Sequence, residues 1–236
     1  MLFKIIRYNI ALNLGHIHPF LPLISDIGVL PPEASICSLF MNFGSLQLIF
    51  FAIIRSQAIK VFIENNKIIS QDVIQKQRNL IRLSLVSGLG MATGQAITGN
   101  FPNSDEPFVQ TLHTIGAYIV FVSSLFEIYF GSKLAFCQSL DITARFRFIQ
   151  FELHLMIALV FCIFHYSSFY AYPLAYFNIS ARLMWNSSND GYYFHIIATV
   201  SEWFLIINLS VYYFSYVSQF RQFSLSRQIV VIKGFN

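Results

Sequence analysis

The sequence ISDIGVLPPEASICSLFMNF, from Ile24 to Phe43, joins two apolar segments through a short acidic turn. Its Asp-Ile-Gly triplet predicts a turn in which Gly28 is free to take a positive φ angle. The two prolines that follow stiffen the backbone, because each ring fixes φ near about −65°. Glu33 comes directly after them and suits a helix start, where a carboxylate meets the positive end of the helix dipole. We therefore expect a loop of fixed shape that presents Asp26 and Glu33 at one membrane surface.

The composition of the whole chain argues against an ordinary soluble domain. Of its 236 residues, 56% are hydrophobic and 11% are charged, and the mean hydropathy is +0.59. Soluble domains carry about 25% charged residues, so this chain has too little polar surface to cover a globule in water. The cysteines are odd in number and match no metal-binding spacing: Cys37, Cys137 and Cys162. We expect a membrane protein without a metal or a cofactor.

Five apolar stretches are long enough to cross a bilayer, which takes about 20 residues of helix. They are Ile36–Ile54, Leu80–Thr98, Thr114–Gly131, Phe151–Tyr170 and Phe194–Val217. Lipid offers backbone groups no hydrogen-bond partner, so each stretch is expected to be helical. The sequence thus predicts an all-α, polytopic helical membrane bundle that forms one domain over residues 1–236.

A shortened first span is expected ahead of these five. Polar residues and prolines interrupt the stretch from Ile5 to Ile24. A helix from Leu2 to Ile17 would hold about 16 residues and reach about 24 Å, short of the bilayer core of about 30 Å. We therefore expect a first helix that does not cross the membrane completely.

Basic residues gather on one side of the predicted bundle. They follow the first, third and fifth long spans: Arg55, Lys60, Lys67, Lys76, Arg78, Arg82, Lys133, Arg145, Arg147, Arg221, Arg227 and Lys233. Because basic loops stay in the cytosol, we predict that this side is cytosolic, together with a tail at residues 218–236. The opposite side holds five acids and one base: Asp26, Glu33, Asp105, Glu106, Asp190 and Arg182. The pI near 9.0 is therefore better explained by the orientation of the chain in the membrane than by nucleic-acid binding. The basic side could also contact anionic lipid.

Two glycosylation sequons fall on the acidic side, in the loop before the last span. They begin at Asn178 and Asn186 and agree with the predicted orientation, since glycans are added outside the cytosol. Asn186 is the favoured acceptor, because Asn178 lies closer to the predicted membrane surface.

Two patterns inside the spans concern helix packing. Gly90 and Gly94 form a GxxxG pattern, which lets helices approach closely, and we expect it to pack within the bundle. Glu127 lies near the cytosolic end of its span, with Lys133 six residues later. We expect its carboxylate to reach the surface or to pair locally, and we assign it no function.

Two segments are distinctive: GHIHPFLPLISDIGVLPPEASICSLFMNF at Gly15–Phe43 and the last span from Tyr193 to Trp203. Both resemble the damage-regulated autophagy modulator (DRAM) family, within the wider DRAM/Frag/Sfk group. Gly99–Phe101 and Leu112–Ala117 are weaker matches. The resemblance implies six spans with both termini in the cytosol, lysosomal or endomembrane residence, and a role that promotes autophagy and, in some members, cell death.

This chain departs from the family pattern in two places. Only fourteen residues precede Gly15, where the family carries a full first span. Thr114 stands where the family tends to carry an acidic residue after the histidine, which weakens any proposal of a His–Asp pair at His113.

Six polar residues are candidates for one luminal cluster: Asp26, Glu33, Asn100, His113, His195 and Glu202. Ionisable residues inside a membrane suggest a function by default, because each costs about 2.5–3.5 kcal/mol at a helix centre. His195 and Glu202 lie seven residues apart and so share one helix face. The cluster is either a lipid-headgroup or metal site, or a hydrogen-bonded network that fixes helix packing. The second interpretation is favoured, because the spacing matches no metal motif.

The sequence and its resemblance together predict a multi-span endolysosomal protein that modulates autophagy through interactions or lipid organisation. No nucleophile elbow, HExxH or paired-acid motif is present, so we expect no enzyme activity. The expected partners are membrane lipids and proteins bound by the cytosolic loops. One alternative is a lipid- or GPI-anchor-remodelling factor that uses His113, His195 and Glu202. Another is a plasma-membrane scaffold for a phosphoinositide kinase.

Overall fold

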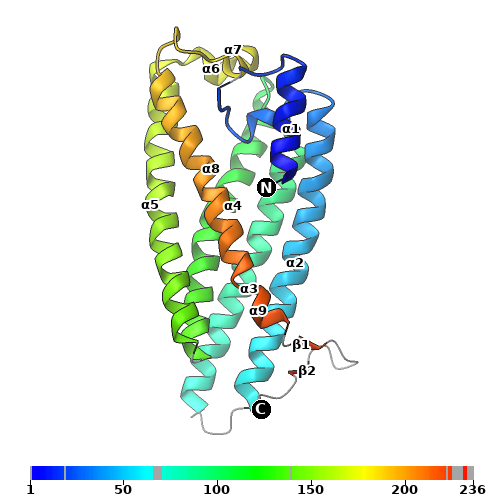
Figure 1. Cartoon of the computed structure of the whole chain (residues 1–236), viewed down its shortest axis with the longest axis vertical. Coiled ribbons are helices and arrows are strands. Elements are labelled where there is room, and N and C mark those ends of the chain that lie inside the picture. The colour runs from blue at the N-terminus through cyan, green and yellow to red at the C-terminus, as the bar shows by residue number, and fades with distance from the viewer. Residues whose placement is uncertain are drawn as a thin grey trace.

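The computed structural model describes residues 2–18, 20–65, 71–138, 140–221, 223–224 and 231–232. Its long helices stand side by side in one elongated bundle (Figure 1). The long helices are α2 (Glu33–Asn65), α3 (Gln71–Asn100), α4 (Pro107–Cys137), α5 (Asp141–Ala171) and α8 (Tyr192–Phe214). The short elements are α1 (Leu2–Asn13), η1 (Asp26–Gly28), α6 (Leu174–Phe177), α7 (Ile179–Leu183), α9 (Val217–Phe220), β1 (Phe223–Ser224) and β2 (Val231–Ile232).

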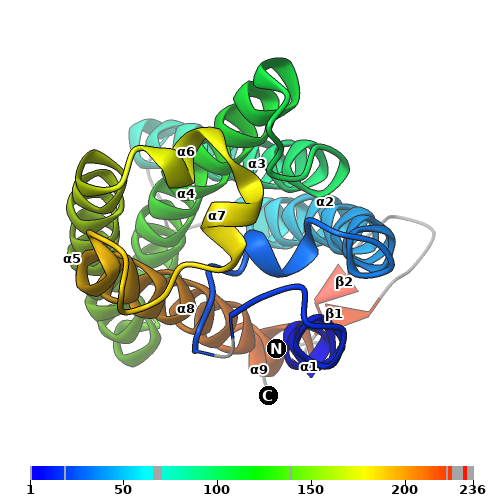
Figure 2. The same ribbon diagram turned by 90° about the horizontal axis from the view of Figure 1, so that it is seen from above.

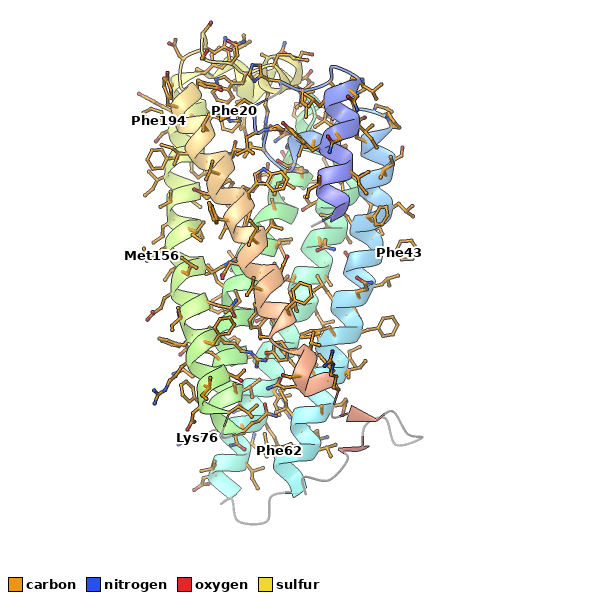
Figure 3. All side chains as sticks on the ribbon, in the orientation of Figure 1. Phe20, Phe43, Phe62, Lys76, Met156 and Phe194 are labelled. Atoms are coloured by element: carbon orange, nitrogen blue, oxygen red, sulfur yellow. The ribbon has the colours of Figure 1, made fainter. Side chains whose placement is uncertain are left out.

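The predicted five spans and the all-α class are confirmed. Within the described residues, five helical stretches of 29–31 residues are long and apolar enough to cross a membrane. At 1.5 Å per residue each reaches about 44–46 Å, so its ends extend beyond the hydrocarbon core of about 30 Å. Phe43 and Met156 point outward from the middle of the bundle, where lipid would surround it (Figure 3).

The first helix is even shorter than expected. Helix α1 has 12 residues, which gives about 18 Å, and it ends at Asn13 instead of Ile17. Gly15 follows with φ +70°, the left-handed conformation that commonly ends a helix. Figure 1 shows α1 beside the upper part of α2, with the N-terminus part-way down the bundle.

The connections gather at two opposite ends. We call one the loop end, because residues 14–32, 101–106 and 172–191 cross it (Figure 2). We call the other the basic end; Lys76 lies there, opposite Phe20 and Phe194 (Figure 3). This separation follows the predicted charge asymmetry. Lys67, Arg227 and Lys233 lie outside the described residues.

The acidic turn forms as predicted, but its glycine has a different role. Residues Asp26–Gly28 make one 3₁₀ turn, and α2 begins at Glu33. Gly28 does not adopt a positive φ. A Cβ at this position would lie 2.5 Å from Nη1 of Arg7 and 3.0 Å from Sγ of Cys37. Glycine therefore serves the close approach of Arg7 and Cys37 here, and not a left-handed backbone conformation.

The GxxxG prediction is confirmed within the bundle. A Cβ on Gly94 would lie 2.7 Å from the carbonyl oxygen of Gly116, and one on Gly90 would lie 2.6 Å from Oγ of Ser123. Gly94 thus seats α3 on the backbone of α4 and Gly90 seats it on the Ser123 side chain, so the pattern serves an intramolecular contact.

Part of the predicted tail at 218–236 is described. It contains α9 and an antiparallel pair in which Phe223 faces Ile232 and Ser224 faces Val231. This two-residue ladder adds a small non-helical element that the sequence analysis did not predict. The tail residues 222, 225–230 and 233–236 lie outside the described residues.

Candidate functional site

A buried ion pair joins the acidic turn to helix α7 at the loop end. Nε of Arg182 lies 3.0 and 3.1 Å from the two carboxylate oxygens of Asp26. Asn103 Nδ2 donates to the same carboxylate at 2.8 Å. Asp26 is only 2% exposed, so the predicted presentation of this carboxylate at the surface is wrong. Arg182 is the one base that the sequence places on the acidic side, and a buried charge needs such a counterion.

The sequon residues lie in the same region. Asn178 precedes α7, and its side-chain oxygen accepts from Ala181 N–H at 2.9 Å, which caps the helix that carries Arg182. Asn186 lies in the following turn and donates to the carbonyl of Met184 at 3.1 Å. Glycosylation at Asn178 and Asn186 remains a prediction.

Two predicted histidines lie close to the Asp26–Arg182 pair. Nδ1 of His113 lies 2.7 Å from the carbonyl oxygen of Phe101, and the His195 ring stacks on Trp185 at 4.4 Å between centroids. Both imidazoles interact electrostatically with Asp26 and Arg182. The structure thus brings together three of the six candidates: Asp26, His113 and His195.

Glu33 belongs to a second group, next to α1. Nδ1 of His16 donates to Oε1 of Glu33 at 2.9 Å. The Glu33 side chain is 1% exposed, whereas that of His16 is 27% exposed. Glu33 therefore starts α2 as predicted, but its carboxylate points inward and ties α2 to the turn after α1. The prediction that the Glu33 carboxylate is presented at the membrane surface is also wrong.

The carboxylate of Glu202 holds the first loop by a hydrogen bond to the backbone of that loop. Oε2 of Glu202 accepts from Ile24 N–H at 2.7 Å, while Nη2 of Arg7 donates to the Ile24 carbonyl at 3.0 Å. Burial lowers the pKa of the Arg7 guanidinium, and nearby Cys37, Glu202 and Glu33 oppose that shift. One residue of the loop is therefore held from both α1 and α8.

Asn100 lies apart from both groups, so its predicted place in the cluster is wrong. Its Oδ1 accepts from Ser38 Oγ at 2.8 Å and from Asn42 Nδ2 at 3.0 Å, and its Nδ2 donates to Asn42 Oδ1 at 3.0 Å. These bonds join the end of α3 to α2. The sequence suggested that Asn100 shares the loop end, but not which helix face it occupies.

The sequence analysis missed a second buried ion pair, nearer the basic end. Glu127 forms two hydrogen bonds with Arg55, one to Nη1 and one at 3.2 Å to Nη2. Their side chains are 0% and 2% exposed. Contrary to the expectation from the sequence, Glu127 therefore neither reaches the surface nor pairs locally, and the nearby Lys133 ammonium lies over the rings of Tyr129 and Phe148. The signal in the sequence that could have revealed this pair was an acid inside one apolar span and a base directly after another.

Two tyrosines of the last span region complete this group. The hydroxyls of Tyr212 and Tyr216 each lie 3.2 Å from Nη1 of Arg55 and 2.9 Å from one another. Arg147 of α5 covers Tyr216, with its guanidinium carbon 3.5 Å from the ring centre, and donates to Ser215 Oγ at 2.9 Å. The sequence analysis counted Arg55 and Arg147 among the basic residues of the cytosolic side. The structure shows that both have a structural role.

The predicted catalytic alternative finds no support in this geometry. His113, His195 and Glu202 are buried, and each contacts protein atoms. An open groove of about 600 Å³ lies elsewhere, along α2, and is lined by Ser35, Ser38, Leu39, Asn42, Phe43 and Leu46. Within the described residues, no group of three or more His, Cys, Asp or Glu side chains is placed to hold a metal ion.

These features define a polytopic α-helical membrane protein that buries several ionisable groups inside the bundle. The chain belongs to the Frag1/DRAM/Sfk1/Cwh43P N-terminal domain family, which matches residues 2–223. The predicted family resemblance is therefore confirmed. No solved structure was found that matches the chain significantly.

Three relatives show how far the similarity extends. DNA damage-regulated autophagy modulator protein 1 of Xenopus laevis is 24% identical over 97% of this chain and 89% of its own length. The human protein of the same name is 26% identical, over 94% of this chain and 86% of its own length. DNA damage-regulated autophagy modulator protein 2 of Rattus norvegicus is 25% identical, over 94% and 79% respectively.

Proposed function

We propose that this chain is a multi-span protein of lysosomal or other endomembranes that modulates autophagy without catalysing a reaction. The observation that carries the proposal is similarity along nearly the whole chain to proteins named as autophagy modulators. The predicted orientation adds support, because it places the loop end in the lumen and the basic end in the cytosol.

The closed loop end supports a non-catalytic mode of action. A catalytic group must reach its substrate, and His113, His195 and Glu202 are each more than nine-tenths buried. The lipid-facing surface and the basic end are available for contacts. We propose that these surfaces organise lipid or bind a protein partner.

The first experiment locates the protein. A fluorescently tagged full chain, expressed at a low level, is expected to overlap with lysosomal or other endomembrane markers. A signal confined to the plasma membrane would contradict the proposed location and favour the scaffold alternative.

The second experiment measures autophagic flux in cells that lack the protein and are then given it back. The wild-type chain is expected to restore lysosome-dependent turnover of a cytosolic reporter. His195→Gln and Glu202→Gln are expected to retain that activity at matched protein levels, since neither acts as an acid or base. Loss of flux in a variant of normal abundance and thermal stability would instead support the catalytic alternative.

A further inference from the structure

We propose that two copies of this chain associate in the membrane through the outer face of α2, with the side-chain amides of Gln47 bonded to one another across a two-fold axis. The contact does not rest on the proposed function, because it requires only that α2 crosses a bilayer. It follows from one polar side chain to which lipid offers no hydrogen-bond partner.

Gln47 lies at the middle of the membrane-spanning part of α2. That part runs from Glu33 to Ile63, so Gln47 is about 21 Å from one end and about 24 Å from the other. The hydrocarbon core is about 30 Å thick, which places this residue near its centre. The side chain is exposed on the bundle surface, and within the described part of the chain its amide forms no hydrogen bond. The amide therefore faces hydrocarbon without a partner, which is costly.

Other polar side chains in the spans avoid this cost. Asn208, at the middle of α8, is buried, and its Nδ2 donates to the carbonyl oxygen of Gln150 at 3.0 Å. Thr93 of α3 is exposed, but its hydroxyl donates to the carbonyl oxygen of Leu89 in its own helix at 3.0 Å. Gln47 differs from both, because it is neither buried nor bonded.

A second copy of the chain can supply the missing partner, because a carboxamide is self-complementary. Each amide has N–H donors and an oxygen acceptor, so two amides that face each other form two bonds. The chain already contains this arrangement between Asn42 and Asn100, whose Nδ2 atoms each donate to the Oδ1 of the other at 3.0 Å. A two-fold axis brings the same surface of both copies together. It therefore sets Gln47 of one copy opposite Gln47 of the other.

The side chains around Gln47 form an apolar surface that a second helix can pack on. Phe43 and Phe50 lie one turn to either side of Gln47 and are 58% and 63% exposed. Leu46 is 52% exposed, and with Phe43 it lines the open groove along α2. Phe43 points away from the bundle, on the side opposite Met156 (Figure 3). Packing of these side chains would exclude lipid from the paired amides.

The outer face of α2 is available for this contact. Among the five spans of the described residues, that of α2 has the smallest share of its surface inside the bundle. Helix α1 lies beside the upper part of α2 and not beside its middle (Figure 1). The sequence between Glu33 and Arg55 contains no charged residue, so two copies meet there without like-charge repulsion.

Photo-crosslinking shows where copies touch. Purified full chains in phosphatidylcholine vesicles carry a photoreactive residue on one of two lipid-facing sides, as Phe43→benzoylphenylalanine on α2 or Met156→benzoylphenylalanine on α5. The α2 position is expected to give a product of twice the chain mass, and the α5 position only lipid adducts. Lipid adducts alone from both positions, or equal amounts of the double-mass product from both, would overturn the contact.

Energy transfer between donor- and acceptor-labelled full chains measures the strength of association over a series of protein-to-lipid ratios. Gln47→Leu removes the amide without opening a cavity, and it is expected to weaken association about five- to thirty-fold. Wild type mixed with Gln47→Leu should be similarly weak, because a reciprocal pair needs both amides. Thr93→Val is the control and should match the wild type, since the Thr93 hydroxyl is already bonded within its helix.

Two results would refute the role of Gln47. One is a Gln47→Leu chain that associates as tightly as the wild type. The other is a wild-type chain that stays monomeric at every protein-to-lipid ratio. Both measurements use purified chains in vesicles, so their failure would leave the proposed cellular location and the effect on autophagic flux to be judged separately.

Discussion

Glu127 and Arg55 offer the sharpest stability test, because the pair is buried and each partner can be removed alone. In Glu127→Met the guanidinium of Arg55 keeps three neutral oxygens, those of Ser84, Tyr212 and Tyr216. It loses both bonds to the only carboxylate it contacts among the described hydrogen bonds. Stranding one member of a buried pair costs about 3–5 kcal/mol.

The double variant Arg55→Met/Glu127→Met separates this pairing from simple loss of packing. It strands no charge, and methionine fills a similar volume in both places. The three hydroxyls that lose Arg55 cost about 1 kcal/mol each at most, because they can still bond with one another or with backbone. We expect the double variant to be destabilised by no more than about 3 kcal/mol, well below the sum of the two single variants.

The assay is reversible unfolding of the purified chain in mixed micelles, followed by helical circular dichroism. Glu152→Met is the control, since this acid lies exposed on α5 and should change stability by about 0.5 kcal/mol or less. Single variants that each cost under about 1 kcal/mol, with an additive double variant, would refute the assignment of a coupled buried pair.

Three further predictions concern packing, the loop end and modification. Gly94→Ala should lower the unfolding temperature more than Gly44→Ala does, because the new methyl meets fixed α4 backbone in the first case and a movable Gln side chain in the second. Arg182→Met should cost about 3–5 kcal/mol by stranding the carboxylate of Asp26, and adding Asp26→Asn should recover part of that stability in the same unfolding assay. Asn186→Gln should remove an endoglycosidase-sensitive shift in gel mobility, and an unchanged shift would assign any glycan elsewhere.

The spans and the separation of charge could be predicted because lipid imposes them on the sequence directly. A helix must be apolar for about 20 residues to cross the core, and this length is visible without any tertiary contact. The role of Gly94 was visible for a similar reason, since a small residue every fourth position marks a close helix contact. Arg182 was noticeable as a lone base on an acidic side.

The partners of the buried charges could not be predicted, because they depend on helix rotation and on long-range pairing. Arg55 and Glu127 are 72 residues apart, and each looked like a residue that could reach a membrane surface. Asp26 was correctly placed in a turn and Glu33 at a helix start, but neither position gives a periodic signal that distinguishes an inward from an outward side chain. Gly28 illustrates the same limit, since its close neighbour Arg7 comes from another element.

Helix α8 contacts both buried groups at well-separated positions. Glu202 holds the first loop, and Tyr212 contacts the Arg55–Glu127 pair ten residues later, about 15 Å along the helix. Buried Leu205 lies between them on the same helix. Sites more than about 7–10 Å apart without shared partners act nearly independently. A change in the contact between Glu202 and the first loop is therefore expected to leave the Arg55–Glu127 pair, which joins α2 to α4, nearly unchanged.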